Sequence, residues 1–427
     1  MNSPIIPEQV DRAIDEKPSL FRKPVLRTLS KFRVGQLQLH LPSGEVLTFG
    51  EGQGKATLIV KDEAFFKRCA LYGGVGMGES YIDGEWESKD LRAVITWFIR
   101  NIAADRKLRG SSQRFKAVGL LRMVDRVYHW LRPNSLEKSR RNIAEHYDLG
   151  NEFYKLWLDP SMTYSSALFT KADQTLEEAQ AAKYESLCQK LRLQESDHVL
   201  EIGCGWGGFC EYAASNYGCR VTAVTISEAQ HAFAVQRMKA AGLEDKVDIR
   251  LQDYREVEGV FDKIVSIEML EAVGDRFLKP YFAKCEEVLA PEGLLAVQII
   301  TVPDQRHAQL RRGTDFIQRH IFPGSLLLSI GRIGEVLDQT SDLTLHELQD
   351  LGASYARTLR EWHEAFNEVL PEVREQGFSE AFIYKWNYYL KYCEAAFATR
   401  NISVVQAVYS RPNNAALHRE DGVNTCG

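Results

Sequence analysis

The chain has 427 residues, enough for two or three domains with a substantial core. Hydrophobic residues make up 44% and charged residues 26%, which is the balance of an ordinary globular protein. Since the formal net charge is −5, the average surface gives no indication of nucleic-acid binding, and we expect no nucleic-acid partner.

The eight cysteines are scattered and include no CxxC pair, which favours buried, reduced thiols over disulfides or zinc. No His-Glu-x-x-His or comparable spacing occurs, so we expect no metal. The first residues do not resemble a signal peptide, and no apolar run approaches the roughly 20 residues that span a bilayer. We therefore expect a cytoplasmic protein whose membrane contact is peripheral.

The N-terminal part, residues 1–105, reads as a small α+β domain. Between 33 and 60 apolar and polar residues alternate, and the alternation is broken at Pro-Ser-Gly (42–44) and Gly-Gln-Gly (52–54). This pattern predicts short strands joined by hairpin turns. From 62 to 103 the apolar spacing becomes helical, with interruptions at glycines.

The next segment, residues 106–141, is strongly basic and amphipathic. It holds eleven Lys or Arg against two acidic residues, with aromatic and aliphatic side chains between them. Such a stretch suits a helix that lies on an anionic bilayer, at the inner face of the membrane. A basic linker helix that packs only on its own protein explains the pattern equally well.

Residues 142–410 alternate between strand and helix patterns, and 411–427 form a C-terminal tail. The alternation predicts an α/β fold with a Rossmann-like, doubly wound, mainly parallel sheet. The expected elements are a helix at 176–193, strand 199–202, helix 208–216, strand 220–226, helix 227–241, strands 247–253 and 261–269, helix 277–289 and strand 294–300.

Three glycines, Gly203, Gly205 and Gly207, stand between the first of these strands and the following helix. Glycines at such a turn let the backbone approach a ligand without a Cβ clash. A ribose is usually met by an acid about 20 residues further on. This chain instead has Thr225 and then Gln230, so neutral hydrogen-bonding groups would hold the ribose.

The third strand ends in LQDYRE, residues 251–256. Asp253 there can accept a hydrogen bond from an adenine amine, and Tyr254 supplies an aromatic face beside it. Taken with the two preceding strand ends, this arrangement predicts an adenosyl ligand.

The chain resembles the cyclopropane fatty acid synthases, and the resemblance covers nearly its whole length. Similar motifs also occur in the N-terminal part, in FGEGQ (49–53) and GMGESYIDGEWESKDL (76–91). The specific segments are EHYDLGNEFYKLWLDPSMTYSSALF (145–169), VLEIGCGWGGF (199–209), LQDYRE (251–256), SIEMLEAVG (266–274), QIITVPDQR (298–306), RGTDFIQRHIFPG (312–324), SYARTLREW (354–362) and YYLKYCEAAF (388–397).

The resemblance implies a class I methyltransferase fold with helical additions, and S-adenosylmethionine as cofactor. It assigns a set of cofactor-binding residues: Tyr147, Tyr164, Ser165, Gly203, Gly205, Thr225, Ile226, Gln230, Tyr254 and Ile267. It also implies a bicarbonate ion beside the reacting carbon, in a catalytic pocket that maps onto Ser166, Glu271, Gln298, Ile300 and Tyr355.

This pocket departs from the pattern of the bacterial members at three positions. Ser166 stands where they usually have Cys, Gln298 where many have His, and Ala272 where the residue after the site glutamate is often His. The plant-like branch shares the Glu-Ala pair and the Gln. Serine and glutamine can still donate hydrogen bonds to an anion.

Methyl transfer to a carbon–carbon double bond leaves a carbocation that must be stabilised and then lose a proton. Glu271 could serve as the base or orient it; a salt-bridged or solvated residue beside Glu268 is the alternative. Aromatic faces can stabilise the cation, and the candidates are Tyr164, Phe316, Tyr355, Trp386, Tyr388 and Tyr389. For the run 382–397 the favoured reading is an ordinary helix that packs its aromatics in the core.

The leading hypothesis is transfer of a one-carbon unit to the unsaturated acyl chains of membrane phospholipids, which forms cyclopropane fatty acids. The alternatives are a C-methyltransferase that gives methyl- or methylene-branched chains, a small-molecule methyltransferase, and a lipid-binding protein without activity. A homodimer is left open.

Overall fold

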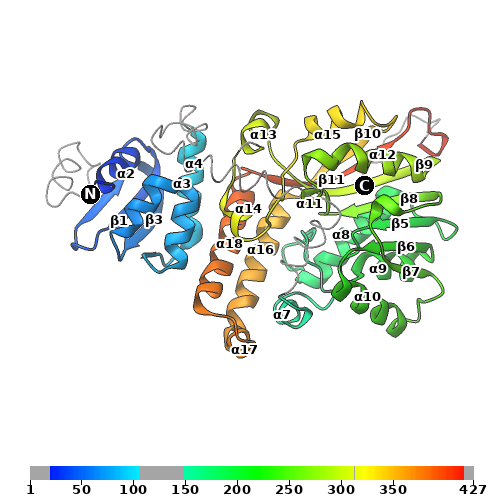
Figure 1. Cartoon of the computed structure of the whole chain (residues 1–427), viewed down its shortest axis with the longest axis horizontal. Coiled ribbons are helices and arrows are strands. Elements are labelled where there is room, and N and C mark those ends of the chain that lie inside the picture. Colours follow the sequence, from blue (N-terminus) through cyan, green and yellow to red (C-terminus); the bar gives the residue numbers. More distant parts are fainter. Residues whose placement is uncertain (1–19, 105–148, 312, 418–427) are drawn as a thin grey trace. The chain divides into compact units, whose positions relative to one another are not determined.

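The computed structural model describes residues 20–104, 149–311 and 313–417. These residues group into two compact units (Figure 1). Unit 1 comprises the described parts of 1–133, 309–323 and 356–402, and unit 2 those of 134–308, 324–355 and 403–427. The domain boundaries expected from the sequence stay a prediction, and the basic segment 106–141 lies outside the described residues.

Unit 1 contains a four-stranded sheet in the order β2-β1-β3-β4, together with helices. Its elements are α2 (Arg22–Leu29), β1 (Val34–His40), β2 (Val46–Phe49), β3 (Glu51–Val60), α3 (Ala64–Ile82), β4 (Trp86–Glu87), α4 (Leu91–Ala104), α14 (Phe316–His320), most of α16 (Gly352–Glu368), α17 (Leu370–Glu375) and α18 (Glu380–Ala398).

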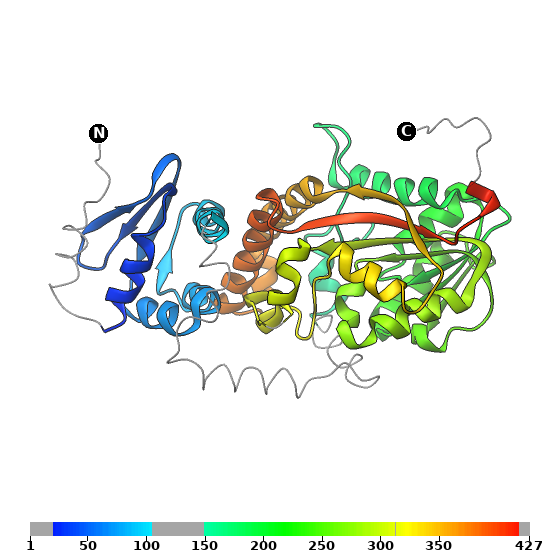
Figure 2. The ribbon, with the colours of Figure 1, turned by 90° about the horizontal axis from the view of Figure 1, so that it is seen from above.

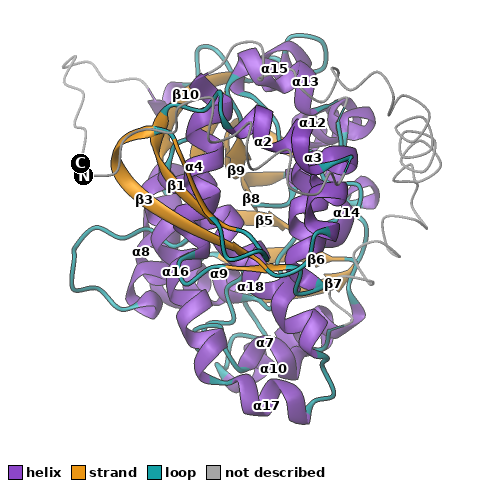
Figure 3. Cartoon of the chain, turned by 90° about the vertical axis from the view of Figure 1, so that its left-hand side faces the viewer, coloured by secondary structure: helices purple, strands orange, loops and turns teal. Residues whose placement is uncertain are grey.

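Only one of the two predicted hairpin turns is present. β1 and β2 are antiparallel across the turn that contains Gly44, but β3 runs parallel to β1 on its other side. Figure 3 shows β1 and β3 next to each other. Gly-Gln-Gly (52–54) lies inside β3, at a register shift, so a turn there was wrong. The chain reverses instead at Gly50, where a Cβ would stand 2.1 Å from the Gly35 carbonyl oxygen, and only glycine fits this crossing.

The aromatic run of α18 packs in the core of unit 1, as favoured from the sequence. The ring of Trp386 stacks on Phe382 at 5.3 Å, and that of Tyr388 meets Phe316 edge-on at 4.6 Å. Trp386, Tyr388 and Tyr389 are buried. Ring pairs of this geometry stabilise a fold beyond the area that they bury, so core packing is sufficient to explain these side chains.

Unit 2 contains a seven-stranded sheet in the order β10-β11-β9-β8-β5-β6-β7. Its elements are α7 (Asn151–Lys155), α8 (Leu176–Leu191), β5 (His198–Ile202), α9 (Gly208–Tyr217), β6 (Arg220–Thr225), α10 (Glu228–Ala240), β7 (Val247–Leu251), η3 (Tyr254–Glu256), β8 (Phe261–Ile267), α11 (Leu270–Val273), η4 (Asp275–Phe277), α12 (Leu278–Val288), β9 (Leu289–Thr301), α15 (Ile330–Leu337), β10 (Thr344–Asp350), β11 (Ser403–Ser410) and η5 (Ala415–Leu417). α13 (Asp304–Leu310) spans the boundary between the units.

The predicted doubly wound, mainly parallel sheet is confirmed. β9, β8, β5, β6 and β7 are parallel neighbours. β11, the red strand in Figure 2, and β10 extend the sheet antiparallel beside β9. The parallel strands therefore bring their carboxyl ends to one edge, where ligands bind in open α/β sheets. β7 and β8 each end two residues earlier than predicted, which leaves Asp253 and Glu268 in the loops after the strands.

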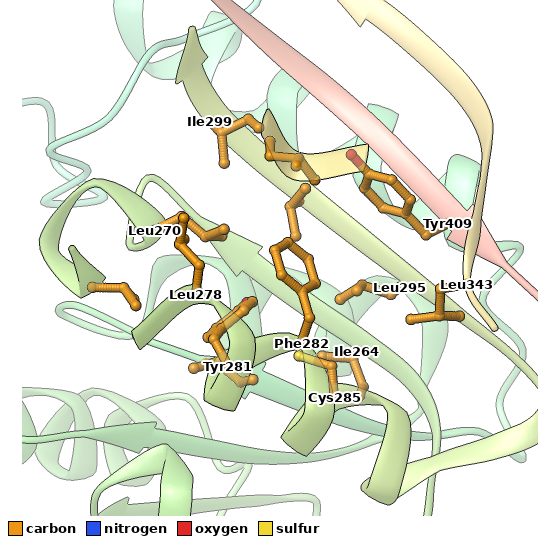
Figure 4. Packing of buried hydrophobic residues seen from close by; sticks show 14 of the residues in the cluster. Ile264, Leu270, Leu278, Tyr281, Phe282, Cys285, Leu295, Ile299, Leu343 and Tyr409 are labelled. Carbon is orange, nitrogen blue, oxygen red and sulfur yellow. The ribbon is translucent and has the colours of Figure 1, made fainter. Parts of the chain in front are cut away.

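The core between α12 and the sheet holds this edge in place. Tyr281, Phe282 and Cys285 of α12 pack against Ile264 of β8 and Leu295 of β9 (Figure 4). Each fully buried side chain of this size contributes about 1.5–3 kcal/mol. Within the described part of the chain, no helix combines the length and apolar composition needed to cross a bilayer.

Candidate active site

The glycine turn between β5 and α9 is shaped by the backbone alone. Gly203 and Gly205 have φ angles of 86° and 54°, in the left-handed region. A Cβ on Gly203 would stand 2.8 Å from Met269 Cγ, so this glycine is required by the fold. A Cβ on Gly205 would meet nothing within 4 Å. The Gly205 backbone thus faces open space beside the start of α9, which fits a ligand seated against the turn.

The predicted ribose-binding pair lies together at the end of β6. The Thr225 hydroxyl donates to Gln230 Oε1 at 3.0 Å, and the Ser227 hydroxyl accepts the Gln230 backbone N–H at the start of α10. Thr225 and Gln230 are both buried. Their mutual hydrogen bond orients the Gln230 amide; Ile226 follows directly after β6, and Gly207 precedes α9 as its N-cap.

At the end of β7 the predicted adenine acceptor has a protein partner. Asp253 accepts hydrogen bonds from the Arg255 backbone N–H at 3.0 Å and from its guanidinium at 2.8 and 2.7 Å. The Tyr254 ring packs on Tyr281 at 5.3 Å. A role for Asp253 and Tyr254 toward adenine stays a prediction.

Tyr164 and Ser165 lie in the loop before α8, a helix that begins with a capping box at Thr175. The ring of Tyr164 contacts Tyr154 at 5.3 Å, and Ser165 Oγ accepts from Lys183 Nζ at 2.9 Å. Lys183 is fully buried, and burial lowers its pKa to about 7. Ile267 is the last residue of β8, whereas Tyr147 lies outside the described residues.

Three residues of the predicted anion pocket converge on one side chain, Glu268, directly after β8. The Ser166 backbone N–H and Gln298 Nε2 each donate to Glu268 Oε1 at 2.8 Å. The Tyr355 hydroxyl donates to Oε2 at 2.9 Å. Since these donors serve a protein carboxylate, the residues present do not fit a separate bicarbonate ion on the same donors.

The other two predicted residues pair with each other. Glu271 Oε1 accepts the Ile300 backbone N–H at 2.5 Å, and Oε2 has no hydrogen-bond partner among the described residues. Burial, and then the negative charge of Glu268, raise the pKa of Glu271 to about 8. Glu271 is therefore mostly protonated at neutral pH.

A second layer of amides fixes the donors around Glu268. Gln298 on β9 faces Gln406 on β11, whose Nε2 donates to Gln298 Oε1 at 3.1 Å. The Ser186 hydroxyl in turn donates to Gln406 Oε1 at 2.8 Å. These hydrogen bonds orient the Gln298 side chain so that its amino group faces Glu268. Ser166 acts through its backbone, because its hydroxyl donates to the Ala167 carbonyl.

Two residues of this arrangement were not assigned from the sequence. Glu268 was weighed only as a neighbour of Glu271, although its place right after a parallel strand was a usable signal. Lys183 lies in the helix predicted at 176–193, but its burial beside Ser165 depends on tertiary packing.

The cation-stabilising candidates divide between the two units. Tyr164 and Tyr355 lie in unit 2, whereas Phe316, Trp386, Tyr388 and Tyr389 lie in unit 1. The structure therefore brings only Tyr164 and Tyr355 into the unit that holds the glycine turn and Glu268.

Comparison with known proteins gives a consistent picture. The family model described as mycolic acid cyclopropane synthetase matches residues 134–407. The tuberculostearic acid methyltransferase of Mycobacterium tuberculosis is 38% identical over 391 residues, 86% of this chain and 87% of that protein. The cyclopropane-fatty-acyl-phospholipid synthase of Escherichia coli is 37% identical over 362 residues, 84% of this chain and 89% of that protein.

Among solved structures, the cyclopropane synthase MmaA2 of Mycobacterium tuberculosis matches with a TM-score of 0.59 at 31% identity, covering 66% of this chain and 99% of that chain. The mycolic acid cyclopropane synthase CmaA1, in complex with SAH and CTAB, has the same TM-score at 28% identity and the same coverage.

Proposed function

Because the chain belongs to the family described as mycolic acid cyclopropane synthetase, we propose that it closes cyclopropane rings on the unsaturated acyl chains of membrane phospholipids. The fold is that of a class I methyltransferase, and the protein is an S-adenosylmethionine-dependent methyltransferase of this family. The lipid class and the ring product are the proposed part.

The observation that carries the proposal is the placement of a carboxylate and its donors at the edge of the sheet that also carries the glycine turn. Glu268 follows β8, and the turn at Gly203 to Gly207 follows its neighbour β5. Methylation of an alkene gives a carbocation that must lose a proton, so this reaction needs a base close to the methyl donor.

The bound cofactor supplies an electrophilic methyl group on a sulfonium sulfur. In our proposal the glycine turn, Thr225 and Gln230 hold its adenosyl part. The ring of Tyr164, packed on Tyr154 and Trp157, stabilises positive charge without offering a strong nucleophile. The neutral Glu271 carboxyl group keeps a second full negative charge out of the site.

The proposal is tested with purified protein, labelled methyl donor and vesicles of phosphatidylglycerol that carry oleoyl chains. We expect label in the acyl chains and a mass increase of one CH2 group, in a product that ozone does not cleave. Label on no lipid, with transfer to a soluble amine or phenol instead, would refute the proposal and support a small-molecule methyltransferase.

A second candidate, methyl or methylene branching, is favoured by the identity to the tuberculostearic acid methyltransferase. The same experiment separates the two, because a methylene-branched chain adds the same mass and remains cleavable by ozone. Expression in a host without such activity, followed by analysis of its acyl chains, gives the answer in a living membrane.

Peripheral binding at the inner face of the membrane through 106–141 is also proposed. Its support is the eleven basic residues of that segment, since Lys and Arg are attracted to anionic head groups. Co-sedimentation with anionic but not with neutral vesicles is expected, and it should weaken as salt is raised. Equal binding to both kinds of vesicle would contradict an electrostatic role.

A further inference from the structure

The Glu268 carboxylate accepts the hydrogen bonds that a bound anion would need. Its two carboxylate oxygens accept from Ser166 N–H, Gln298 Nε2 and Tyr355 Oη at 2.8, 2.8 and 2.9 Å. A carboxylate and a bicarbonate ion share the planar CO2 group, so one set of donors can satisfy either of them. The chain thus carries its own anion where the resemblance implied a bound one.

The backbone at Glu268 adopts a conformation that is costly for a residue with a side chain. Its φ angle is 52°, in the left-handed region that residues with a Cβ rarely adopt. The Glu268 N–H donates to the Gln298 carbonyl at 2.7 Å, which holds the residue beside β9. Glycine would relieve this strain, yet the chain has a glutamate here.

The electrostatic surroundings of Glu268 and Glu271 differ and affect the pKa values of the two carboxyl groups differently. Burial raises the pKa of Glu268, while its three donors and the Lys183 ammonium oppose that shift. Among the described residues, only backbone N–H groups and no ammonium lower the pKa of Glu271, so it holds the proton more readily. Two carboxyl groups with different environments can take opposite protonation states at one pH.

We propose that the Glu268 carboxylate is the proton acceptor of the reaction and replaces bicarbonate; this inference rests on the proposed function. From the described residues Oε1 accepts two hydrogen bonds and Oε2 one, which leaves an acceptor position on Oε2 within that part of the chain.

The alkene π pair forms the new C–C bond to the methyl group, and the C–S pair remains on sulfur, which becomes a neutral thioether. The adjacent carbon is then cationic. Glu268 Oε2 takes a proton from the new methyl group, and the C–H pair closes the ring. The carboxyl group later returns this proton to solvent, and no other co-reactant is required.

The experiment uses the full-length protein in the vesicle assay, in buffer stripped of carbon dioxide and again with added bicarbonate or formate. The wild type should change by less than about twofold between these conditions. Glu268→Gln removes the base but fills the same space, and should lose about 10³-fold in turnover in all of them. Glu268→Gly should lose as much, and recover at least tenfold with bicarbonate or formate, because it vacates the donors.

Binding of the product S-adenosylhomocysteine shows whether Glu268→Gly loses turnover because it is misfolded. Glu268→Gly removes backbone strain, and its binding of S-adenosylhomocysteine, measured by calorimetry, should equal that of the wild type. The matched control is Glu258→Gln, a change of the same chemistry at an exposed residue, which should leave turnover unchanged.

A wild type that methylates lipid only when bicarbonate is added would overturn the inference and leave the proposed function standing. Full activity of Glu268→Gln would do the same. A wild type that methylates no lipid under any condition refutes the proposed function and this inference with it.

Discussion

The glycine turn after β5 and the acid pocket after β8 are neighbours in the sheet, but they are built in different ways. The turn is formed by the backbone of five consecutive residues, Gly203 to Gly207. The pocket is formed by groups from distant segments, Ser166, Glu268, Gln298 and Tyr355, and a second layer at Gln406. The backbone shape of the turn is thus encoded locally, whereas the hydrogen bonds of the acid pocket require tertiary structure.

The largest expected effect is at the turn. Gly205→Val should raise the Kd for S-adenosylmethionine at least about 100-fold, equivalent to ~3 kcal/mol, because its side chain enters the space a ligand needs. Calorimetry measures this. Gly242→Val is the matched control, since Gly242 also has a positive φ and open space around it, but lies in an exposed turn. Equal losses in both variants would mean that backbone strain, and not the site, is responsible.

The second prediction concerns the pH dependence of stability in the pocket. The pKa of Glu271 is raised from 4.5 to about 8, so the folded state holds a proton that the unfolded state releases. Its contribution is complete below pH 4.5 and is lost as pH rises through 8. Glu271→Gln should therefore gain about 3–4 kcal/mol relative to the wild type between pH 5 and pH 8.

Urea unfolding at the two pH values measures this difference. The Gln side chain can still accept the Ile300 N–H, so the variant keeps the hydrogen bond that Glu271 makes. Parallel stability curves for the two proteins would show that Glu271 is charged in the folded state.

A smaller effect is expected at the third donor of the pocket. Tyr355→Phe removes the hydroxyl that donates to Glu268 Oε2 and should lower kcat about tenfold, or ~1.4 kcal/mol, with little change in KM. Tyr388→Phe in α18 is the control, because that ring packs in the core of unit 1. If both variants lose activity equally, the contrast between a chemical and a packing tyrosine does not hold.

The smallest effect is expected at Ser166. Its backbone N–H contacts Glu268, while its hydroxyl donates to the Ala167 carbonyl. Ser166→Ala should therefore change turnover by less than about threefold, or ~0.6 kcal/mol. A loss of tenfold or more in the vesicle assay would show that the side chain takes part in the chemistry.

The class of fold could be predicted from the sequence because the patterns that indicate it span only a few residues each. Alternating strand and helix patterns, with glycines after β5, predict a parallel sheet and its binding edge, and the observed order of strands agrees. The second hairpin in unit 1 was misread, because a glycine cluster marks either a turn or a bulge. Only the crossing of the chain at Gly50, close to Gly35, distinguishes the two.

The sequence alone determined the class of fold, the glycine turn and the family motifs that point to methyl transfer. Only the tertiary structure decided that Ser166, Gln298 and Tyr355 donate to Glu268 and that Lys183 is buried beside Ser165. It also decided that Glu271 Oε2 finds no hydrogen-bond partner within the described part of the chain. The physical reason is that periodicity and turn chemistry act over a few residues. Desolvation and hydrogen bonding of a carboxylate depend on groups that only the folded chain brings within 3 Å.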